Sequence, residues 1–341
     1  MQTEIYIDGN RYSEHSFSYE NDFETLIKDN SNTLFGKNSI YLDLKNKVDT
    51  KALGGTIPDG FLFDFSDVDN PEFYLVEVEL NKHSFYNHIF PQITKFFAFF
   101  RIPDSRNALV EKLFTYIQSN KDIEKEFINY LGDKEIYRSI KDIVDNSQNI
   151  LLIIDEMKPE LDEIMETYTD TWDKMVKISI LKKYSSENNG KNILAISPPF
   201  QEINFLESNL KDSDKDSEKY TEAYHLESVE KNTIEIYESI KQFVRTLDSN
   251  IIINSQKYYI SFKGNKNFAF ILLKRKKIHL VVMLPHELAE QRIKVNLLKK
   301  LAPSVQKFYN GPCVSITIDN KDGLNEVYEA IQESYKAQGK K

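Results

Sequence analysis

The sequence predicts a mixed α/β fold with α+β character, followed by a small α+β C-terminal domain with antiparallel hairpins. Between residues 20 and 155, apolar periodicity indicates a helix, three strands, a helix and another strand, which is typical of a mixed sheet flanked by helices. Residues 201–230 are charged, polar and typical of a linker. After them, short apolar runs alternate with turn residues, which predicts hairpins.

The elements of the first domain follow from their periodicity. A helix is expected at 18–30, strands at 39–45, 61–65 and 73–80, a helix at 84–102, a helical insertion at 105–147, a strand at 149–155, a helix at 160–168, and strands at 175–184 and 191–200. Pro91 predicts either a kink in the 84–102 helix or a helix that begins near this residue.

Three segments organise the chain: a domain at 1–200, a linker at 201–229 and a basic α+β domain at 230–341. The last opens with a helix at 230–247, continues with strand-like runs between 251 and 284, and ends with a strand at 312–319 and a helix at 322–338. A length of 341 residues with 40% hydrophobic residues is sufficient for two cores.

Composition excludes several classes of protein. The single cysteine, Cys313, rules out an intramolecular disulfide framework and a cysteine-rich zinc cage. No G-x-x-x-x-G-K-[ST] motif is present, which argues against a P-loop NTPase. The start, MQTEIYIDGN, lacks a signal-peptide pattern and no long apolar run occurs, so we expect a soluble, cytoplasmic protein with no membrane partner.

Charge is distributed unevenly along the chain. The net charge is −9, yet residues 251–310 contain twelve Lys and Arg against two acidic residues, so this segment carries +10 and the remainder −19. Such a segment attracts phosphate backbones without reading sequence. The KRKK run is predicted to be a hairpin tip; on its own, a charged tip is usually only solvated. The candidate nucleic-acid contacts are Lys274, Arg275, Lys276 and Lys277.

Three carboxylates are expected at one edge of the first sheet. Glu77 and Glu79 are two residues apart in a strand, so they share a face, and Asp59 lies in a Pro-Asp-Gly turn before a neighbouring strand. A strand with Glu at alternate positions is more often a solvated face. The other positions of both strands are strongly apolar, which favours a buried site. Converging carboxylates repel one another, and a hard divalent cation offsets that repulsion.

Residues 20 to about 155 resemble the PD-(D/E)XK nuclease superfamily, whose restriction-endonuclease-like core is a helix, a β-meander, a helix and a strand. The motif pieces stand in the family's order: Glu24 in the first helix, Pro58-Asp59 at the second strand, Glu77-Val78-Glu79 in the third, and Gln92 in the following helix. The resemblance implies that Asp59, Glu77 and the Val78 carbonyl hold Mg²⁺ or Mn²⁺. Glu24 would support them, and Gln92 would belong to the catalytic set.

The family's lysine position holds Glu79 in this chain. Some restriction endonucleases of the superfamily carry Glu there, so Glu79 can act as a general base or bind a second metal. Alternatively, Lys82 or Lys95 supplies the missing cation, or the site is inactive.

His83 and His88 are auxiliary candidates. Each histidine alone is better explained as part of a hydrated surface. Together they directly follow the strand of Glu77, where they can hydrogen-bond the carboxylates or touch a phosphate. His88, Gln92 and Lys95 fall near one face of the predicted helix.

Residues 230–338 also resemble a small domain of unknown function that is fused to nuclease-like proteins in prokaryotes. The resemblances together imply a metal-dependent nuclease of restriction or anti-phage defence, with DNA favoured over RNA, and with a second copy or a defence-system protein as further candidate partners. The alternative is a catalytically inactive nuclease fold that serves as a nucleic-acid-binding or protein-interaction scaffold.

Overall fold

The computed structural model describes residues 3–44, 57–68, 71–168, 171–172, 175–186, 190–203, 220–227, 229–256, 259–301 and 303–339. The chain divides into unit 1 (Met1–Asn204) and unit 2 (Phe205–Lys341), which are described separately. Much of the predicted linker, residues 204–219 and 228, lies outside the described residues. No helix within the described ranges has the length and apolar character needed to cross a bilayer.

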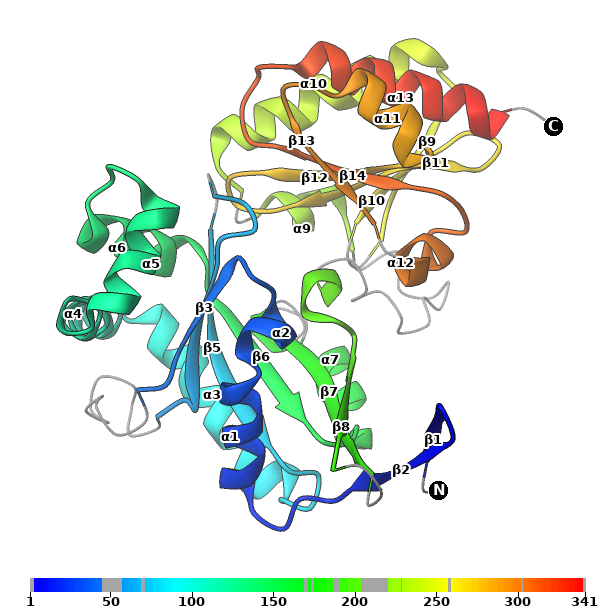
Figure 1. Cartoon of the computed structure of the whole chain (residues 1–341). Coiled ribbons are helices and arrows are strands. Elements are labelled where there is room, and N and C mark those ends of the chain that lie inside the picture. Colours follow the sequence, from blue (N-terminus) through cyan, green and yellow to red (C-terminus); the bar gives the residue numbers. More distant parts are fainter. Residues whose placement is uncertain are drawn as a thin grey trace. The chain divides into compact units, whose positions relative to one another are not determined.

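Unit 1 contains a sheet and helices on both of its faces (Figure 1). In chain order its elements are β1 (Glu4–Ile7), β2 (Asn10–His15), α1 (Glu20–Asp29), α2 (Ser31–Phe35), β3 (Ser39–Leu42), β4 (Gly60–Asp64), β5 (Glu72–Glu79), the π-helix η2 (Phe85–Ile89), α3 (Phe90–Arg101), α4 (Pro103–Ser119), α5 (Lys121–Leu131), α6 (Ile136–Asn146), β6 (Asn149–Ile154), α7 (Pro159–Thr167), β7 (Val176–Ser185), β8 (Asn192–Ser197) and the 3-10 turn η4 (Phe200–Glu202).

The strand order is β1-β2-β7-β6-β5-β4-β3, with β8 paired to β7. β5, β6 and β7 are parallel, whereas β3, β4 and β5 form an antiparallel meander. This confirms the predicted mixed sheet. The β1–β2 hairpin, which the periodicity did not indicate, extends the sheet through β7.

Alternate residues of β5 pack against different helical layers. Phe73 and Leu75 belong to the apolar cluster formed with α3–α7, while Tyr74, Val76 and Val78 belong to the cluster formed with α1 and α2. A strand buried on both faces reads as a nearly continuous apolar run. Two acidic residues inside such a run therefore need a specific reason to be there.

The helix after β5 begins near Pro91, as one of the two expectations from sequence had it. Pro91 lies in the first turn of α3, a position where proline is common. The preceding turn is the π-helix η2, and the Ser84 side chain caps it by accepting from the Asn87 backbone N–H.

Unit 2 is an antiparallel sheet in the order β13-β14-β12-β11-β10-β9. Its elements are α9 (Glu222–Leu226), α10 (Lys231–Leu247), β9 (Ile252–Ser255), β10 (Ile260–Lys263), β11 (Asn267–Leu273), β12 (Ile278–Val282), α11 (His286–Arg292), β13 (Leu297–Lys300), α12 (Pro303–Phe308), β14 (Val314–Ile318) and α13 (Leu324–Gly339). The predicted hairpins and the small α+β architecture are confirmed.

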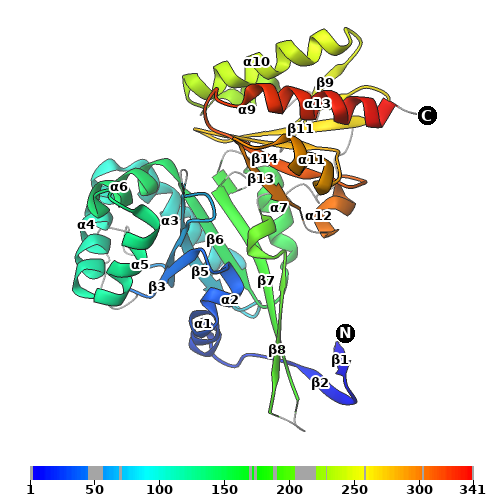
Figure 2. The same cartoon turned by 45° about the horizontal axis from the view of Figure 1, so that its top comes forward.

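Two apolar clusters stabilise unit 2. Residues of α10, α11 and α13 cover one face of its sheet, where α10 and α13 lie side by side (Figure 2). On the other face, Phe270, Leu272 and Met283 pack with Val305 of α12 and with Cys313.

Candidate metal centre

Asp59 is fixed against the end of β5. It is 6% exposed, and its Oδ2 accepts a hydrogen bond from the Val78 backbone N–H at 2.8 Å. The next residue must be glycine, because a Cβ on Gly60 would lie 2.2 Å from Oη of Tyr41. The same hydroxyl donates to the Asp59 backbone carbonyl at 3.3 Å. The Pro-Asp-Gly turn therefore holds its carboxylate by packing as well as by hydrogen bonding.

Further carboxylates surround this position. Carboxylate oxygens of Glu20, Glu24 and Asp59 lie within 4.8 Å of one another. Glu77 is 1% exposed on β5. Burial, and then the negative charges of nearby carboxylates, raises the pKa of the Tyr41 phenol above its usual range; these carboxylates belong to Asp59, Asp43, Glu24 and Glu77. Such a concentration of acidic groups is costly without a cation.

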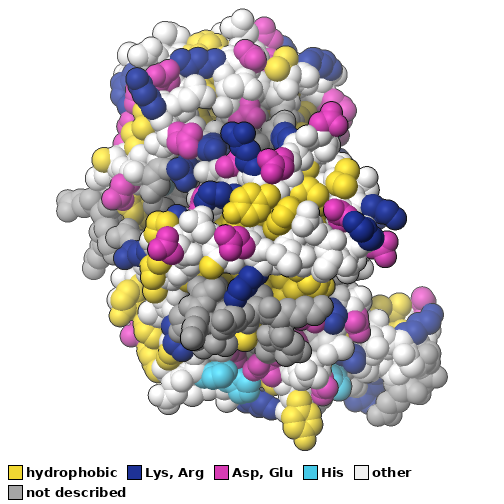
Figure 3. All heavy atoms as spheres, turned by 90° about the vertical axis from the view of Figure 1, so that its left-hand side faces the viewer, with side chains coloured by type: hydrophobic (Ala, Val, Ile, Leu, Met, Phe, Trp, Pro, Cys, Tyr) yellow, Lys and Arg dark blue, Asp and Glu magenta, His cyan; other side chains and the backbone are white. Residues whose placement is uncertain are grey.

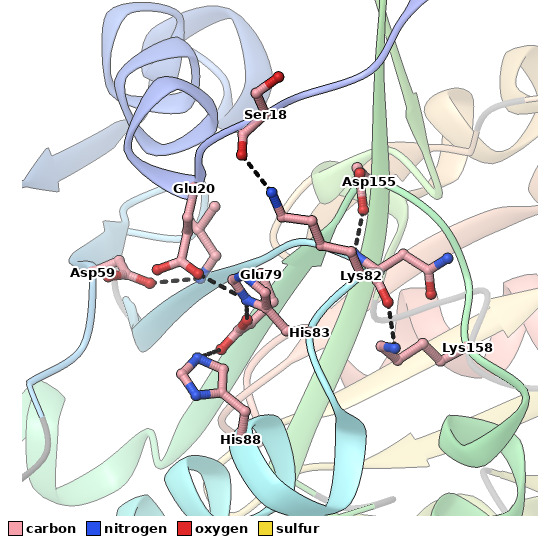
Figure 4. A network of polar contacts seen from close by, with 11 residues as sticks. Ser18, Glu20, Asp59, Glu79, Lys82, His83, His88, Asp155 and Lys158 are labelled. Atoms are coloured by element: carbon pink, nitrogen blue, oxygen red, sulfur yellow. Dashed lines mark hydrogen bonds and ion pairs between the residues drawn. The ribbon is translucent and has the colours of Figure 1, made fainter.

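A second group forms around Glu79, which is 1% exposed (Figure 4). Its Oε2 lies 2.8 Å from Nδ1 of His83, and its Oε1 lies 3.2 Å from Nε2 of His88. Nδ1 of His83 also lies 3.0 Å from Oε2 of Glu20. One ligand atom from each of these four residues lies within 4.8 Å of the other three. Glu77 belongs to neither group of converging ligand atoms among the described residues.

A turn after β5 positions His83. The backbone N–H of Asn81 donates to Oδ1 of Asp155 at 2.6 Å, and the Asn81 carbonyl accepts from Nζ of the buried Lys158 at 2.5 Å. Asp155 directly follows β6, which runs parallel to β5, so its carboxylate reaches the same edge of the sheet as Glu79. The segment that follows the neighbouring strand thus holds both backbone polar groups of Asn81.

The π-helix η2 positions His88. A π-turn accommodates one more residue than an α-turn and is frequent at functional sites. Here it spans Phe85–Ile89 and keeps both of its end residues buried while His88 faces Glu79. A sequence reading that assumes α-helical spacing cannot place this histidine.

Lys82 and Lys95, the two candidates for the role of the family's lysine, lie in different surroundings. Nζ of Lys82 donates to the Ser18 backbone carbonyl, and Figure 4 shows its side chain extending away from Glu79. Lys95 is exposed on α3. Gln92, also on α3, has a buried Oε1 with no hydrogen-bond partner in the described part of the chain. Lys82 is therefore not brought to the carboxylates.

His83 suits metal ligation by its protonation state. Burial, followed by the positive charges of His88 and Lys82, lowers the pKa of His83 below 6.5. The lowered pKa favours the uncharged ring, which is the form of imidazole that ligates a metal.

Four residues that contact or position the site were not predicted from the sequence: Glu20, Tyr41, Asp155 and Lys158. A signal existed for two of them. Glu20 stands four residues before Glu24 on the same helix, so it shares that helix face. Asp155 ends an apolar strand, where parallel strands commonly present functional side chains. For Tyr41 and Lys158 the local sequence pattern contains no signal of a role at the site.

The basic run of unit 2 forms the tip of the β11–β12 hairpin, as predicted, with the Lys274 backbone N–H donating to the Lys277 carbonyl at 2.9 Å. Nε of Arg275 lies 3.4 Å from a Glu230 carboxylate oxygen, and Lys277 is only 6% exposed. Arg275 and Lys276 are exposed. On the face shown in Figure 3, basic and acidic side chains are interspersed, and neither sign covers a continuous area.

Two comparisons with known proteins give matches. A protein of Haemophilus influenzae, described as uncharacterized, is 24% identical over 234 residues, which cover 67% of this chain and 75% of that protein. No solved structure matches the chain. Residues 222–338 match the family model of a domain of unknown function (DUF5655), in agreement with the expectation of a domain of unknown function at 230–338.

Proposed function

We propose that the chain is a Mg²⁺- or Mn²⁺-dependent nuclease, in which unit 1 hydrolyses phosphodiester bonds and basic unit 2 holds nucleic acid or a partner protein. DNA is the favoured substrate, and prokaryotic restriction or anti-phage defence is the setting that the PD-(D/E)XK resemblance suggests. The observation that carries the proposal is the placement of Asp59, nearly buried and hydrogen-bonded to the Val78 backbone N–H beside Glu77 on β5.

The residues present fit a hard divalent cation. Asp59, directly before β4, and Glu77 on the adjacent strand β5 are buried carboxylates, and a carboxylate oxygen of Glu24 on α1 lies within 4.8 Å of one of Asp59. Mg²⁺ and Mn²⁺ prefer such oxygen ligands and leave positions for water and phosphate oxygens. A bound ion would polarise the phosphodiester and lower the pKa of an attacking water. Asp59, Glu77 and the Val78 carbonyl would hold it.

Glu79 would orient or deprotonate the attacking water, or bind a second ion, in place of the family's lysine. Its two oxygens face His83 and His88, which can receive and pass on a proton at this end of the sheet. Gln92, with its buried Oε1, would position substrate or water from α3.

The test is cleavage of plasmid and single-stranded DNA in Mn²⁺ or EDTA by the wild type, Asp59→Asn and Glu77→Gln. We expect cleavage only with Mn²⁺ and a loss of at least about 100-fold in each variant, because removal of a charged group that stabilises a transition state commonly costs that much. Equal activity of all three proteins would exclude the proposed centre.

The same hairpin supplies matched controls. Asp64 and Glu72 pair across β4 and β5 at the opposite end of the two strands. Asp64→Asn and Glu72→Gln repeat the chemical changes without touching the proposed centre, so both should retain wild-type cleavage. A loss in these controls would mean that the changes act through folding.

The second candidate function is a non-catalytic nucleic-acid-binding or scaffold module. Two observations favour it: Glu79 occupies the family's lysine position, and Lys82 is engaged with Ser18 instead. DNA binding measured by fluorescence anisotropy over a range of salt separates the two functions. Binding that weakens steeply with salt, without cleavage in any divalent ion, would favour the module.

A further inference from the structure

We propose that Glu20, Glu79, His83 and His88 form a second cation site that prefers a first-row transition ion of the Zn²⁺ type over Mg²⁺. Because Glu79 also belongs to the proposed nuclease centre, this inference deepens that proposal. Cation binding by these four side chains does not itself require that the chain cleave nucleic acid.

The spacing of the four side chains is close to that of a metal shell. Ligand atoms bound tetrahedrally to Zn²⁺ lie roughly 3.3 Å apart, as follows from bonds of about 2.0–2.1 Å. The three contacts in the group measure 2.8, 3.0 and 3.2 Å, and its most distant atoms lie within 4.8 Å. Small side-chain adjustments are therefore enough to close the shell.

The donor set selects the kind of ion. Two imidazole nitrogens and two carboxylate oxygens suit Zn²⁺ and related transition ions, whereas Mg²⁺ prefers oxygen ligands and retains its waters. The neighbouring group of Glu20, Glu24 and Asp59 supplies only oxygen. The structure thus places a mixed nitrogen–oxygen site next to an all-oxygen site, with Glu20 belonging to both.

In this group two carboxylates compete for a hydrogen bond from the same ring nitrogen. Nδ1 of His83 can carry only one proton, and it lies within 3.0 Å of oxygens from both Glu79 and Glu20. Glu79 is 1% exposed, and the adjacent Lys82 donates to Ser18. A divalent ion between the four ligands offsets both negative charges, and each neutral ring then keeps its single proton on the nitrogen that does not bind the ion.

Neighbouring groups orient the proposed ligands, as is typical of metal sites in proteins. His83 lies in a turn that Asp155 and Lys158 hold through the backbone N–H and carbonyl of Asn81. His88 lies on a π-helix, an irregularity that proteins tend to retain for a functional reason. Outer groups that orient metal ligands typically change metal affinity when they are mutated.

The test uses the full chain, stripped with chelator, and Co²⁺ as a spectroscopic substitute for Zn²⁺. We expect Co²⁺ to give visible absorption bands that saturate with one equivalent, that Zn²⁺ abolishes, and that excess Mg²⁺ leaves unchanged. The double variant His83→Gln/His88→Gln should bind at least about tenfold more weakly. Asp59→Asn should retain the bands.

The matched control is His286→Gln. His286 also lies four residues from a glutamate, Glu290, at 3.9 Å, but on α11 of unit 2. This variant should bind Co²⁺ like the wild type. Equal binding by the wild type and the double variant, or displacement of Co²⁺ by equimolar Mg²⁺, would overturn the inference and leave a hydrogen-bonded cluster as the explanation.

Two further readouts keep the outcomes separate. If the double variant fails to fold, Glu20→Gln replaces it, because Glu20 is a partly exposed ligand at the start of α1, and an unchanged Co²⁺ affinity in that variant would count against the site. Binding is measured without nucleic acid. A chain that binds Co²⁺ but never cleaves DNA refutes the proposed function alone, and a chain that cleaves with Mg²⁺ but gives no Co²⁺ bands refutes this inference alone.

Discussion

Asp59 and Glu77 lie at one end of the β4–β5 hairpin, and Asp64 and Glu72 lie at the other. At the second end, Oδ1 of Asp64 accepts from the Ser66 N–H at 2.9 Å, Oε2 of Glu72 accepts from Tyr74 Oη at 2.6 Å, and both residues are half-buried. At the first end the carboxylates are almost fully buried, and Glu24 adds a further negative charge. Asp and Glu side chains are thus partly exposed at one end of the hairpin and buried near one another at the other end.

Glu326 of unit 2 shows how a carboxylate is held without a cation. It accepts the backbone N–H groups of Lys294, Val295 and Asn296, and also the Asn296 side chain, at 2.7–3.1 Å. Successive N–H groups of this kind form a concave site for an anion. Glu326 is satisfied by donors, whereas the Asp59 end of the hairpin gathers acceptors. The cation that we propose for unit 1 would do for these carboxylates what the N–H donors do for Glu326.

The largest expected effect comes from disturbing the turn that fixes Asp59. Gly60→Ala should lower the free energy of unfolding by about 3 kcal/mol, because the new Cβ would overlap the Tyr41 ring at 2.2–2.5 Å. Denaturant unfolding measures the loss. Gly339→Ala is the control, since a Cβ there meets nothing within 4 Å.

Coupling to Tyr41 separates steric overlap from a general backbone effect. In the background of Tyr41→Ser, which removes the ring, Gly60→Ala should cost about 1 kcal/mol or less. A double-mutant cycle with no coupling between the two positions would contradict the packing explanation of this glycine.

The second prediction uses one probe in each unit. Trp172 is 1% exposed in unit 1 and stacks on Phe90 at 5.4 Å, so its fluorescence reports unfolding of that unit. Cys313 is buried in unit 2, where burial raises the pKa of its thiol to about 12, so alkylation at neutral pH requires opening of that unit. Mn²⁺ at roughly one hundred times its Kd should stabilise the Trp172 transition by about 2.7 kcal/mol.

The Cys313 labelling rate should be unchanged by Mn²⁺, because the carboxylates and histidines of the site all belong to unit 1. Equal stabilisation of both probes would mean that Mn²⁺ acts elsewhere or that the units unfold together. Asp59→Asn should reduce the Mn²⁺-dependent shift at Trp172 while it leaves Cys313 unaffected.

The parts of the fold that sequence could predict are those encoded by local periodicity. β5 and β6 are apolar runs of strand length, and period two places Glu77 and Glu79 on one face. The β1–β2 hairpin has a local signal that was overlooked, the Asp8-Gly9 turn in which both residues have positive φ. Only its pairing with β7, about 170 residues away, has no local record. The burial of Lys277 at the hairpin tip is equally invisible to a charge count.

In the candidate site, too, sequence could predict only what local patterns and the family resemblance encode. Asp59 and Glu24 were expected near one another, and they are, because one precedes a strand of the meander and the other faces the sheet from α1. Glu20 and Asp155 had a local signal, but their partners could not be predicted, since these depend on helix docking and on parallel pairing of β5 with β6. The π-helix that directs His88 is set by tertiary packing.

The third prediction concerns pH. Burial raises the pKa of Glu326, but the N–H groups of residues 294–296 outweigh it, so the pKa lies below its usual value of 4.5. The contribution of Glu326 to the free energy of unfolding is therefore complete above pH 4.5. It is lost as the pH falls through the lower pKa of the folded state. Glu326→Gln should destabilise unit 2 by about 1–2 kcal/mol at neutral pH and by much less near about pH 3.

Urea unfolding followed by circular dichroism measures this difference at both pH values, and Glu329→Gln is the control, because Glu329 is exposed on the same helix. If the loss in Glu326→Gln is the same at pH 7 and at about pH 3, then side-chain packing and not charge explains the role of Glu326.

The smallest effect returns to the two ends of the hairpin. In EDTA, Glu77→Gln should stabilise unit 1 by about 1 kcal/mol, because it removes one negative charge from a buried group of carboxylates. Glu72→Gln replaces a half-buried carboxylate that accepts from Tyr74, so it should be neutral or destabilise by up to about 1 kcal/mol. Trp172 fluorescence during urea unfolding measures both. With Mn²⁺ present the order should reverse, since Glu77→Gln then loses a metal ligand and Glu72→Gln does not. An order that is the same in EDTA and in Mn²⁺ would show that burial at the Asp59 end is structural and that no cation is bound there.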